Sequence, residues 1–297
     1  MLDENSVGVK NVQERELNRV TDQRWFQVAT VTSGLLLIMA GLTWEFIHAN
    51  GHDFVSIYYL AQMLIIGKNA YSFNVQHLEI PNYARYTYDP FAAIFYSPST
   101  GIAILPLGFL SYRLAAIAWY ALLSASLVMG IWQFTKVVAP KWDSGIRLLI
   151  IAFIVCSSSI RTAYWLLQFS PLMLGLFGLY FSALVSKKSG FAAIWGALIL
   201  ILKPTFGLPV IGFSLLGRRY RLTAVILGIW LVINAIGFIR LGGEPAFKDY
   251  RANMAMLELL PVNNPNPYSN RSAERLDLTY LLNGFSPNNL RSHLLAI

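Results

Sequence analysis

The 297-residue sequence is poor in charge, because Asp, Glu, Lys and Arg together fill only 13% of its positions. A soluble domain carries roughly 25% charged residues, since its surface has to be hydrated. The deficit is concentrated in long runs that contain no charged residue, which are 25–44, 90–112, 114–135 and 162–186. Each run is long enough to cross a hydrocarbon core about 30 Å thick as a helix. The sequence therefore predicts an integral membrane protein.

Other absences narrow the class of protein further. The runs lack the alternation of apolar and polar residues of barrel strands, so the sequence predicts an all-α protein. The single cysteine, Cys156, excludes an intramolecular disulfide framework. There is no Walker loop, dinucleotide-binding glycine pattern or His/Cys cluster with metal-ligand spacing, so neither a cofactor nor a metal is implied. The net charge of +8 is dispersed among the loops, which favours membrane lipids rather than nucleic acid as partners.

The apolar runs and the polar segments between them divide the chain into three parts. Residues 1–24 are expected to form a mobile or surface-lying tail, whose basic residues favour a cytoplasmic N-terminus. Residues 25–240 are expected to form a polytopic helical bundle of about seven or eight membrane segments, with an outer loop at 48–89. Residues 241–297 are expected to form a second outer loop and the C-terminal segment. Within the bundle, 189–217 is either one kinked crossing or a hairpin of two short helices.

The first outer loop contains a segment, 53–67, whose apolar residues recur at helical spacing. It is too short to span the membrane comfortably, so we expect a helix lying in the interface, with Ser56, Tyr59 and Gln62 on its polar face. Asp53 suits the N-cap of this helix and Gly67 suits its end. Asp53 also has a chemical interpretation, because a carboxylate at the membrane surface can take a proton from a hydroxyl nucleophile.

Polar and charged residues at or near membrane depth raise the free energy of the protein, so each is expected to have a structural or functional role. Lys203 lies between two apolar stretches, where it either neutralises the phosphate of a lipid carrier or snorkels at a kink. Gln168 stands early in a predicted span, where it either binds substrate or makes interhelical hydrogen bonds. Glu45 and His48, at the end of the first span, are expected as interfacial residues.

Tyrosines precede Pro90 at the start of an apolar run, in the segment Tyr83-Ala-Arg-Tyr-Thr-Tyr-Asp89. Such tyrosines are typical interface anchors. They are also suited to packing against a sugar ring, and Arg85 among them could meet a phosphate. The residues alone leave both interpretations open.

Several of these features, in this order, resemble glycosyltransferase family 87, which belongs to the GT-C superfamily of polytopic enzymes. The elements that carry the resemblance are Asp53-Phe54, Tyr58-Tyr59, Gly67 to Tyr71, Tyr86 to Pro90, Lys203-Pro204 with Arg218-Arg219, and Asn270-Arg-Ser272. The sequence departs from the family pattern where Asp89 replaces a proline and where a Gly-Gln-x-Asn element is reduced to Leu167-Gln168-Phe-Ser170. The family usually continues through further spans after the second outer loop, so a C-terminally truncated chain is one interpretation.

The resemblance implies transfer of a sugar, a mannose-like hexose or a pentose, from a polyprenyl-phosphate donor to an acceptor hydroxyl. The acceptor is a lipid or glycan on the outer face, and the anomeric centre is inverted. The resemblance implies Asp53 as the catalytic base. The substrate-binding residues that it implies are Lys203, Arg85, Tyr88, Asp89, Gln168 and Asn270.

Analogy to where this family is abundant implies a bacterial plasma membrane. The alternative is a non-catalytic membrane protein, such as a lipid-carrier transporter or an assembly subunit of an envelope polysaccharide pathway. That alternative does not explain the helix at Asp53 or the tyrosine-rich loop.

Overall fold

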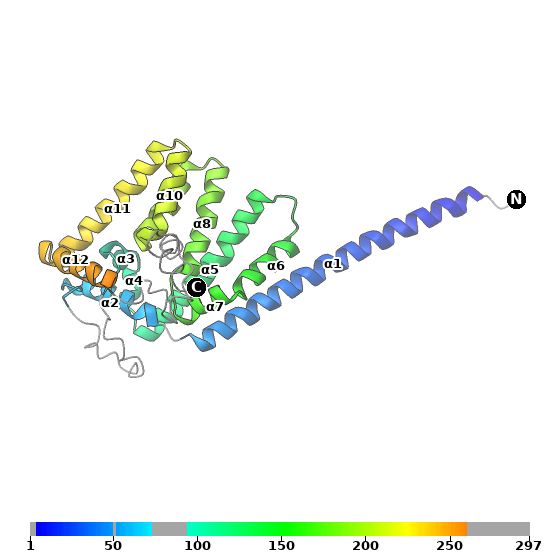
Figure 1. Cartoon of the computed structure of the whole chain (residues 1–297). Helices are drawn as coiled ribbons and strands as arrows, with labels where there is room; N and C mark the ends of the chain where they lie inside the picture. Colours follow the sequence, from blue (N-terminus) through cyan, green and yellow to red (C-terminus); the bar gives the residue numbers. More distant parts are fainter. Residues whose placement is uncertain (1–3, 50–51, 73–93, 260–297) are drawn as a thin grey trace, which may run out of the picture.

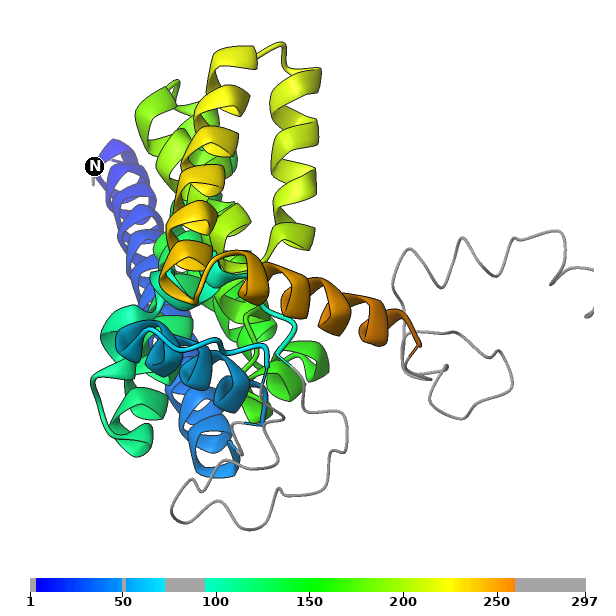
Figure 2. The same ribbon diagram turned by 90° about the vertical axis from the view of Figure 1, so that its left-hand side faces the viewer.

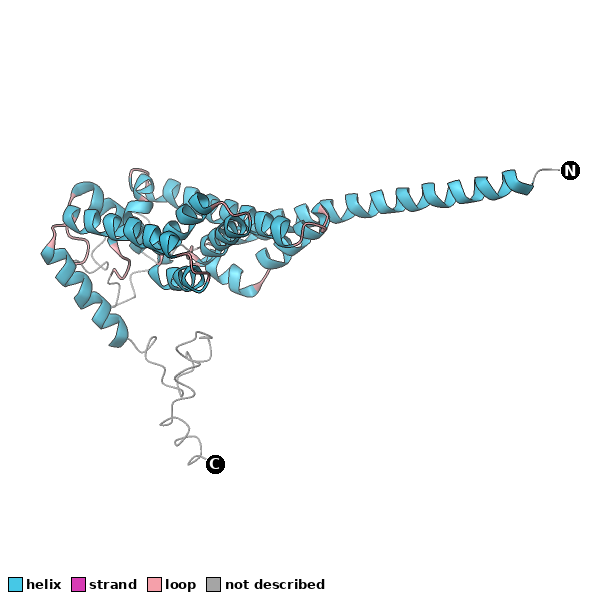
Figure 3. Ribbon diagram, turned by 90° about the horizontal axis from the view of Figure 1, so that it is seen from above, coloured by secondary structure: helices cyan, strands magenta, loops and turns pink. Residues whose placement is uncertain are grey.

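The computed structural model describes residues 4–49, 52–72 and 94–259, and places side chains for 24–49, 53–72 and 94–255. Every regular element in these ranges is a helix, and together the helices form one bundle (Figure 1). The first helix, α1 (Glu4–His48), extends far beyond the bundle at its N-terminal end (Figures 1 and 3). Residues 4–23, expected as a tail, are thus part of this helix.

Three helices are long and apolar enough to cross a membrane. They are the part of α1 from Arg24 to His48, α5 (Tyr112–Val138) and α11 (Tyr220–Arg240). A bent pair adds a fourth if it counts as one span, since α6 (Ser144–Val155) and α7 (Ser158–Trp165) meet at 60°. The prediction of an all-α membrane protein is confirmed for the described residues, whereas seven or eight membrane segments are not found there.

The other apolar helices of the bundle are shorter. They are α8 (Ser170–Val185), α9 (Ser189–Leu202) and α10 (Pro204–Leu216). The longest of them has 16 residues, and at about 1.5 Å per residue such a helix is about 24 Å long. They fill the bundle beside the longer spans.

Prolines explain why two uncharged runs do not form the crossings that they predicted. In the run 90–112 the described residues fold into α3 (Pro98–Ala103) and α4 (Leu105–Gly108), and each begins with a proline in its first turn. In the run 162–186, Pro171 starts α8 after α7 has ended. A proline lacks the N–H that would continue a preceding helix, and its fixed φ suits the first turn of a new one.

The segment 189–217 is a hairpin rather than a kinked crossing. A Cβ atom built on Gly196 of α9 would lie 3.1 Å from Cγ1 of Val210 in α10, and 2.6 Å from Cδ1 of Ile226 in α11. Gly196 and Val210 are equally far in sequence from Lys203, where the chain breaks. The two helices are therefore antiparallel, with Lys203 at the tip.

Glycines bring α5 and α8 into direct backbone contact at the most extensive helix–helix interface of the bundle. A Cβ built on Gly130 of α5 would overlap the carbonyl oxygen of Gly175 in α8, and one built on Gly175 would overlap that of Ser126. Small residues at such crossings let membrane helices pack closely, where no hydrophobic effect drives them together.

Two helices lie across the same end of the bundle, α2 (His52–Ile66) and α12 (Glu244–Leu259) (Figure 2). The predicted helix at 53–67 is confirmed, and it ends at Gly67, whose φ is +70°. Its predicted polar face is wrong at Tyr59, which is buried with Leu60 and Leu64 against Leu241 and neighbouring apolar residues. Because α3, α4 and α5 also contact α2, this helix is enclosed rather than lying with one face in water.

Candidate active site

Asp53 lies in the first turn of α2 and is fixed by its own backbone. The helix begins at His52, so Asp53 is not the predicted N-cap. Its N–H donates a hydrogen bond to the carbonyl oxygen of Leu166, at 3.1 Å. A carboxylate in the first turn is favoured by the exposed N–H groups of a helix N-terminus. The bond to Leu166 ties the start of α2 to the turn between α7 and α8.

That turn is held in a left-handed conformation by a buried tryptophan. Leu167 has φ +53° although it is not a glycine, and its carbonyl oxygen accepts a hydrogen bond from Nε1 of Trp119 at 3.0 Å. The ring of Phe169 packs edge-on against Trp119, with centroids 5.1 Å apart. Gln168, between Leu167 and Phe169 in sequence, is half-buried. The turn therefore brings Gln168, a predicted substrate-binding residue, to the chain segment that fixes Asp53.

Lys203 lies at the tip of the α9–α10 hairpin, at the same end of the bundle as Asp53. The last carbonyl groups of α9 have no continuing helix to bond, because Pro204 has no N–H. Buried hydroxyls of α3 bond them instead: Ser99 donates to Ile201 O at 2.9 Å, and Thr100 donates to Leu202 O at 3.0 Å. The hairpin tip is thereby fixed to α3.

Asp53 and Lys203 act on each other electrostatically although 150 residues separate them in sequence. Lys203 lies outside the candidate spans. Burial lowers its pKa, and the Asp53 carboxylate acts in the opposite direction because it favours the charged amine. The Nζ of Lys203 also lies 5.3 Å from the ring centroid of Phe206. The fold thus collects a carboxylate and an amine, both predicted from the sequence, into one polar site.

Tyr96 is a member of this site that the sequence analysis missed. Its ring packs against Phe169 with centroids 5.6 Å apart, and its carbonyl oxygen accepts a hydrogen bond from the hydroxyl of Tyr71 at 2.9 Å. Burial raises the pKa of Tyr96, and the nearby Asp53 carboxylate raises it further. Its position in the sequence could have indicated this role, because Tyr96 stands two residues before Pro98 as Tyr88 stands two residues before Pro90.

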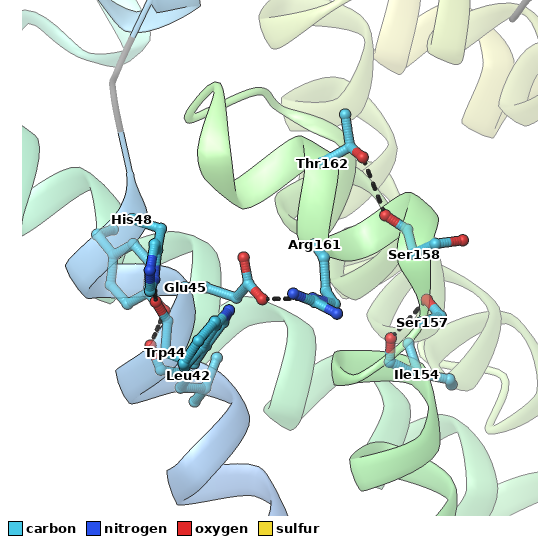
Figure 4. A network of polar contacts seen from close by, with 10 residues as sticks. Leu42, Trp44, Glu45, His48, Ile154, Ser157, Ser158, Arg161 and Thr162 are labelled. Carbon is cyan, nitrogen blue, oxygen red and sulfur yellow. Dashed lines mark hydrogen bonds and ion pairs between the residues drawn. The ribbon is translucent and has the colours of Figure 1, made fainter.

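A second charged contact supports the site from the side of α1 (Figure 4). The Nε of Arg161, in α7, donates to Oε1 of Glu45 at 2.8 Å. Glu45 is only 4% exposed, so its carboxylate is enclosed by the protein. His48 stacks on Trp44 and bonds its carbonyl oxygen at 2.7 Å. The Glu45–Arg161 pair anchors α7, whose C-terminal end holds Asp53 through Leu166.

The remaining predicted site residues lie outside the described part of the chain. Arg85, Tyr88 and Asp89 fall within 73–93, and Asn270 falls within 260–297. Their proposed roles remain predictions.

The fold and the site define a helical integral membrane protein with a carboxylate and an amine gathered at one end of its bundle. Comparison with family models shows a match to glycosyltransferase family 87 over residues 86–287. The chain belongs to this family and is therefore a membrane glycosyltransferase. No curated protein and no solved structure matches the chain significantly.

Proposed function

We propose that the protein transfers a sugar from a polyprenyl-phosphate donor to an acceptor hydroxyl, with inversion at the anomeric carbon. Asp53 is the base and Lys203 binds the phosphate. The observation that carries this assignment is that the Asp53 carboxylate lies close enough to Lys203, at one end of the bundle, to favour the charged amine. Family membership supports sugar transfer, and these two groups supply the proton acceptor and the positive charge that such a transfer needs.

The chemistry follows from the two charges. The Asp53 carboxylate takes the proton of the acceptor hydroxyl as its oxygen bonds to the anomeric carbon. The bond from that carbon to the phosphate oxygen breaks on the opposite face of the sugar, and its electron pair leaves with the phosphate. The Lys203 ammonium group stabilises the charge that develops on this leaving group. Gln168 and the rings around it are placed to hold the sugar or the acceptor.

The distribution of basic residues gives the orientation of the protein in the membrane. Basic residues fill two turns at the end of the bundle opposite Lys203, which are Lys187-Lys188 between α8 and α9, and Arg218-Arg219 between α10 and α11. Loops rich in Lys and Arg stay on the cytoplasmic side. The Asp53 end then faces outward and the N-terminus of α1 is cytoplasmic. We infer a bacterial plasma membrane by analogy with the family.

Transfer assays with a panel of labelled polyprenyl-phosphate sugars test the proposal in membranes that contain the full chain. We expect at least one donor, a hexose or a pentose, to yield a product of inverted anomeric configuration, read by NMR coupling constants. Retained configuration would refute the single displacement with Asp53 as base. Carrier binding without transfer from any donor would favour the alternative of a lipid-carrier transporter or assembly subunit.

Lys203→Arg tests the phosphate role through pH. Because burial lowers the pKa of Lys203, the parent should lose turnover as the pH rises, with an alkaline limb below the ordinary lysine value of about 10.4. An arginine keeps its charge throughout this range, so the limb should move upward in Lys203→Arg. Initial rates between pH 7 and 10.5 measure it, and Lys187→Arg in the opposite turn is the control. An unchanged limb in Lys203→Arg would remove Lys203 from that role.

A further inference from the structure

The side chain of Asn253, in α12, joins two stretches of chain that are distant in sequence. Its Nδ2 donates to the carbonyl oxygen of Tyr71 at 3.2 Å and to that of Ile94 at 3.4 Å. Asn253 is only 9% exposed. An amide has two N–H groups, so one side chain can serve both carbonyls. Without this donor two carbonyl groups in a buried environment would lose their partner.

Further contacts hold α12 in the place that this bond requires. Nδ2 of Asn69 donates to Oδ2 of Asp249 at 2.7 Å, one helical turn before Asn253. The ring of Tyr71 packs against Tyr250 at a centroid distance of 5.1 Å. One face of α12 therefore contacts the segment 69–71, which follows α2. The contacts are a hydrogen bond from Asn69, the packing of the Tyr71 ring and the hydrogen bond from the Asn253 amide.

The two residues bonded by Asn253, Tyr71 and Ile94, are connected to Tyr96 in the candidate active site. Ile94 lies two residues before Tyr96 in the chain, and the Tyr71 hydroxyl donates to the carbonyl oxygen of Tyr96 at 2.9 Å. The ring of Tyr96 then packs on Phe169, in the turn whose Leu166 bonds the N–H of Asp53. A continuous series of contacts thus runs from α12 to Asp53.

We propose that Tyr96 is a positioning residue whose ring, packed on Phe169, holds the turn that fixes Asp53, and that Asn253 and Tyr71 hold Tyr96 in place. This inference rests on the proposed role of Asp53 as base. The helix α12 is in this way part of the catalytic architecture rather than a peripheral segment.

A double-mutant cycle tests the series of contacts. Asn253→Leu removes the donor at nearly constant size, and Tyr96→Leu removes the ring that packs on Phe169. We expect each to lower kcat per folded protein about tenfold, with KM nearly unchanged, and the double variant to be no worse than the poorer single variant, because both interrupt one pathway. Arg251→Ala, at an exposed position of the same helix, should leave kcat unchanged. Strictly multiplied losses in the double variant would overturn the coupling.

A smaller substitution and a measurement that does not depend on turnover distinguish a folding defect from loss of the positioning role. Tyr71→Phe removes only the hydroxyl that bonds Tyr96, so it should lower kcat in the same non-additive way even if Asn253→Leu does not accumulate. With 3-fluorotyrosine placed at position 96, the ¹⁹F resonance should shift in Tyr71→Phe and in Phe169→Leu but not in Arg251→Ala. An unmoved resonance in either of the first two overturns the inference.

The outcomes distinguish this inference from the proposed function. Full turnover of Asn253→Leu and Tyr71→Phe, in a protein that Asp53→Asn silences, would refute the positioning role alone. Turnover that survives Asp53→Asn would refute the assigned base, and with it the role that positioning serves.

Discussion

Asp53→Asn is expected to lower sugar-transfer turnover by about 10²–10⁴-fold, the usual range for loss of a general base. An asparagine has nearly the same size but cannot accept the proton of the acceptor hydroxyl. The fold should survive, because the contact from Asp53 to Leu166 is made by the backbone N–H. Initial rates per amount of folded protein measure the effect. Near-normal turnover would remove Asp53 from the mechanism.

The matched control for this change lies at the other end of the bundle. Asp143 is the N-cap of α6 and accepts a hydrogen bond from Ile146 N at 2.8 Å. An asparagine caps a helix about as well as an aspartate, so Asp143→Asn should leave turnover unchanged. A comparable loss in this variant would show that the assay responds to general destabilisation rather than to a lost base.

A second control separates the base from its electrostatic partner. Asp53→Asn also removes the charge that opposes the lowering of the Lys203 pKa, so Lys203 should lose its proton at lower pH in this variant. Assayed at lower pH, which favours the charged form of Lys203 in both proteins, the loss of turnover should persist. Recovery of turnover at that pH would mean that Asp53 serves only to keep Lys203 protonated.

Gly175→Ala is expected to cause a large loss of stability for the addition of one methyl group. The added Cβ would overlap the carbonyl oxygen of Ser126, and a backbone atom cannot rotate away as a side chain can. Overpacking commonly costs about 1–3 kcal/mol, and a rigid neighbour favours the upper part of this range. The thermal midpoint in detergent, followed by tryptophan fluorescence, should fall by several degrees, as about 1 kcal/mol shifts Tm by roughly 2–4 °C in a chain of this size.

Gly228→Ala is the matched control, because Gly228 lies inside the spanning helix α11 and a Cβ there would meet nothing within 4 Å. Its Tm should stay or rise slightly, since alanine favours a helix over glycine by about 1 kcal/mol. Equal Tm values for the two variants would show that α5 and α8 do not pack through their backbones. Turnover of Gly175→Ala should also fall, because α5 carries Trp119, which holds the turn beside Asp53.

The sequence predicts helices well wherever local chemistry decides the outcome. The uncharged runs without an interior proline, 25–44 and 114–135, became the spans of α1 and α5, because backbone groups in lipid must bond within their own segment. Gly67 ended α2, and Lys203-Pro204 separated α9 from α10. Apolar content was a poorer guide where prolines intervened: at Pro98, Pro106 and Pro171 the runs divided into shorter helices.

The site was predictable in its residue types but not in its assembly. Asp53 and Lys203 were singled out because charges near membrane depth need a reason, and the resemblance to a family gave each a role. Tyr96 carried no comparable signal, because one tyrosine among fifteen acquires meaning only from its neighbours. Asn253 was equally inconspicuous in a polar stretch.

By itself, then, the sequence determined the membrane class, the long spans, the positions of the main breaks and the family, because charge, proline and hydrophobic length act locally. Only the tertiary structure decided that 189–217 folds back as a hairpin, that α2 is enclosed and that Asp53 lies within electrostatic range of Lys203. These features depend on which side chains from distant segments pack together. The local sequence pattern does not specify these contacts, because an apolar face of a helix can pack against any of several other helices.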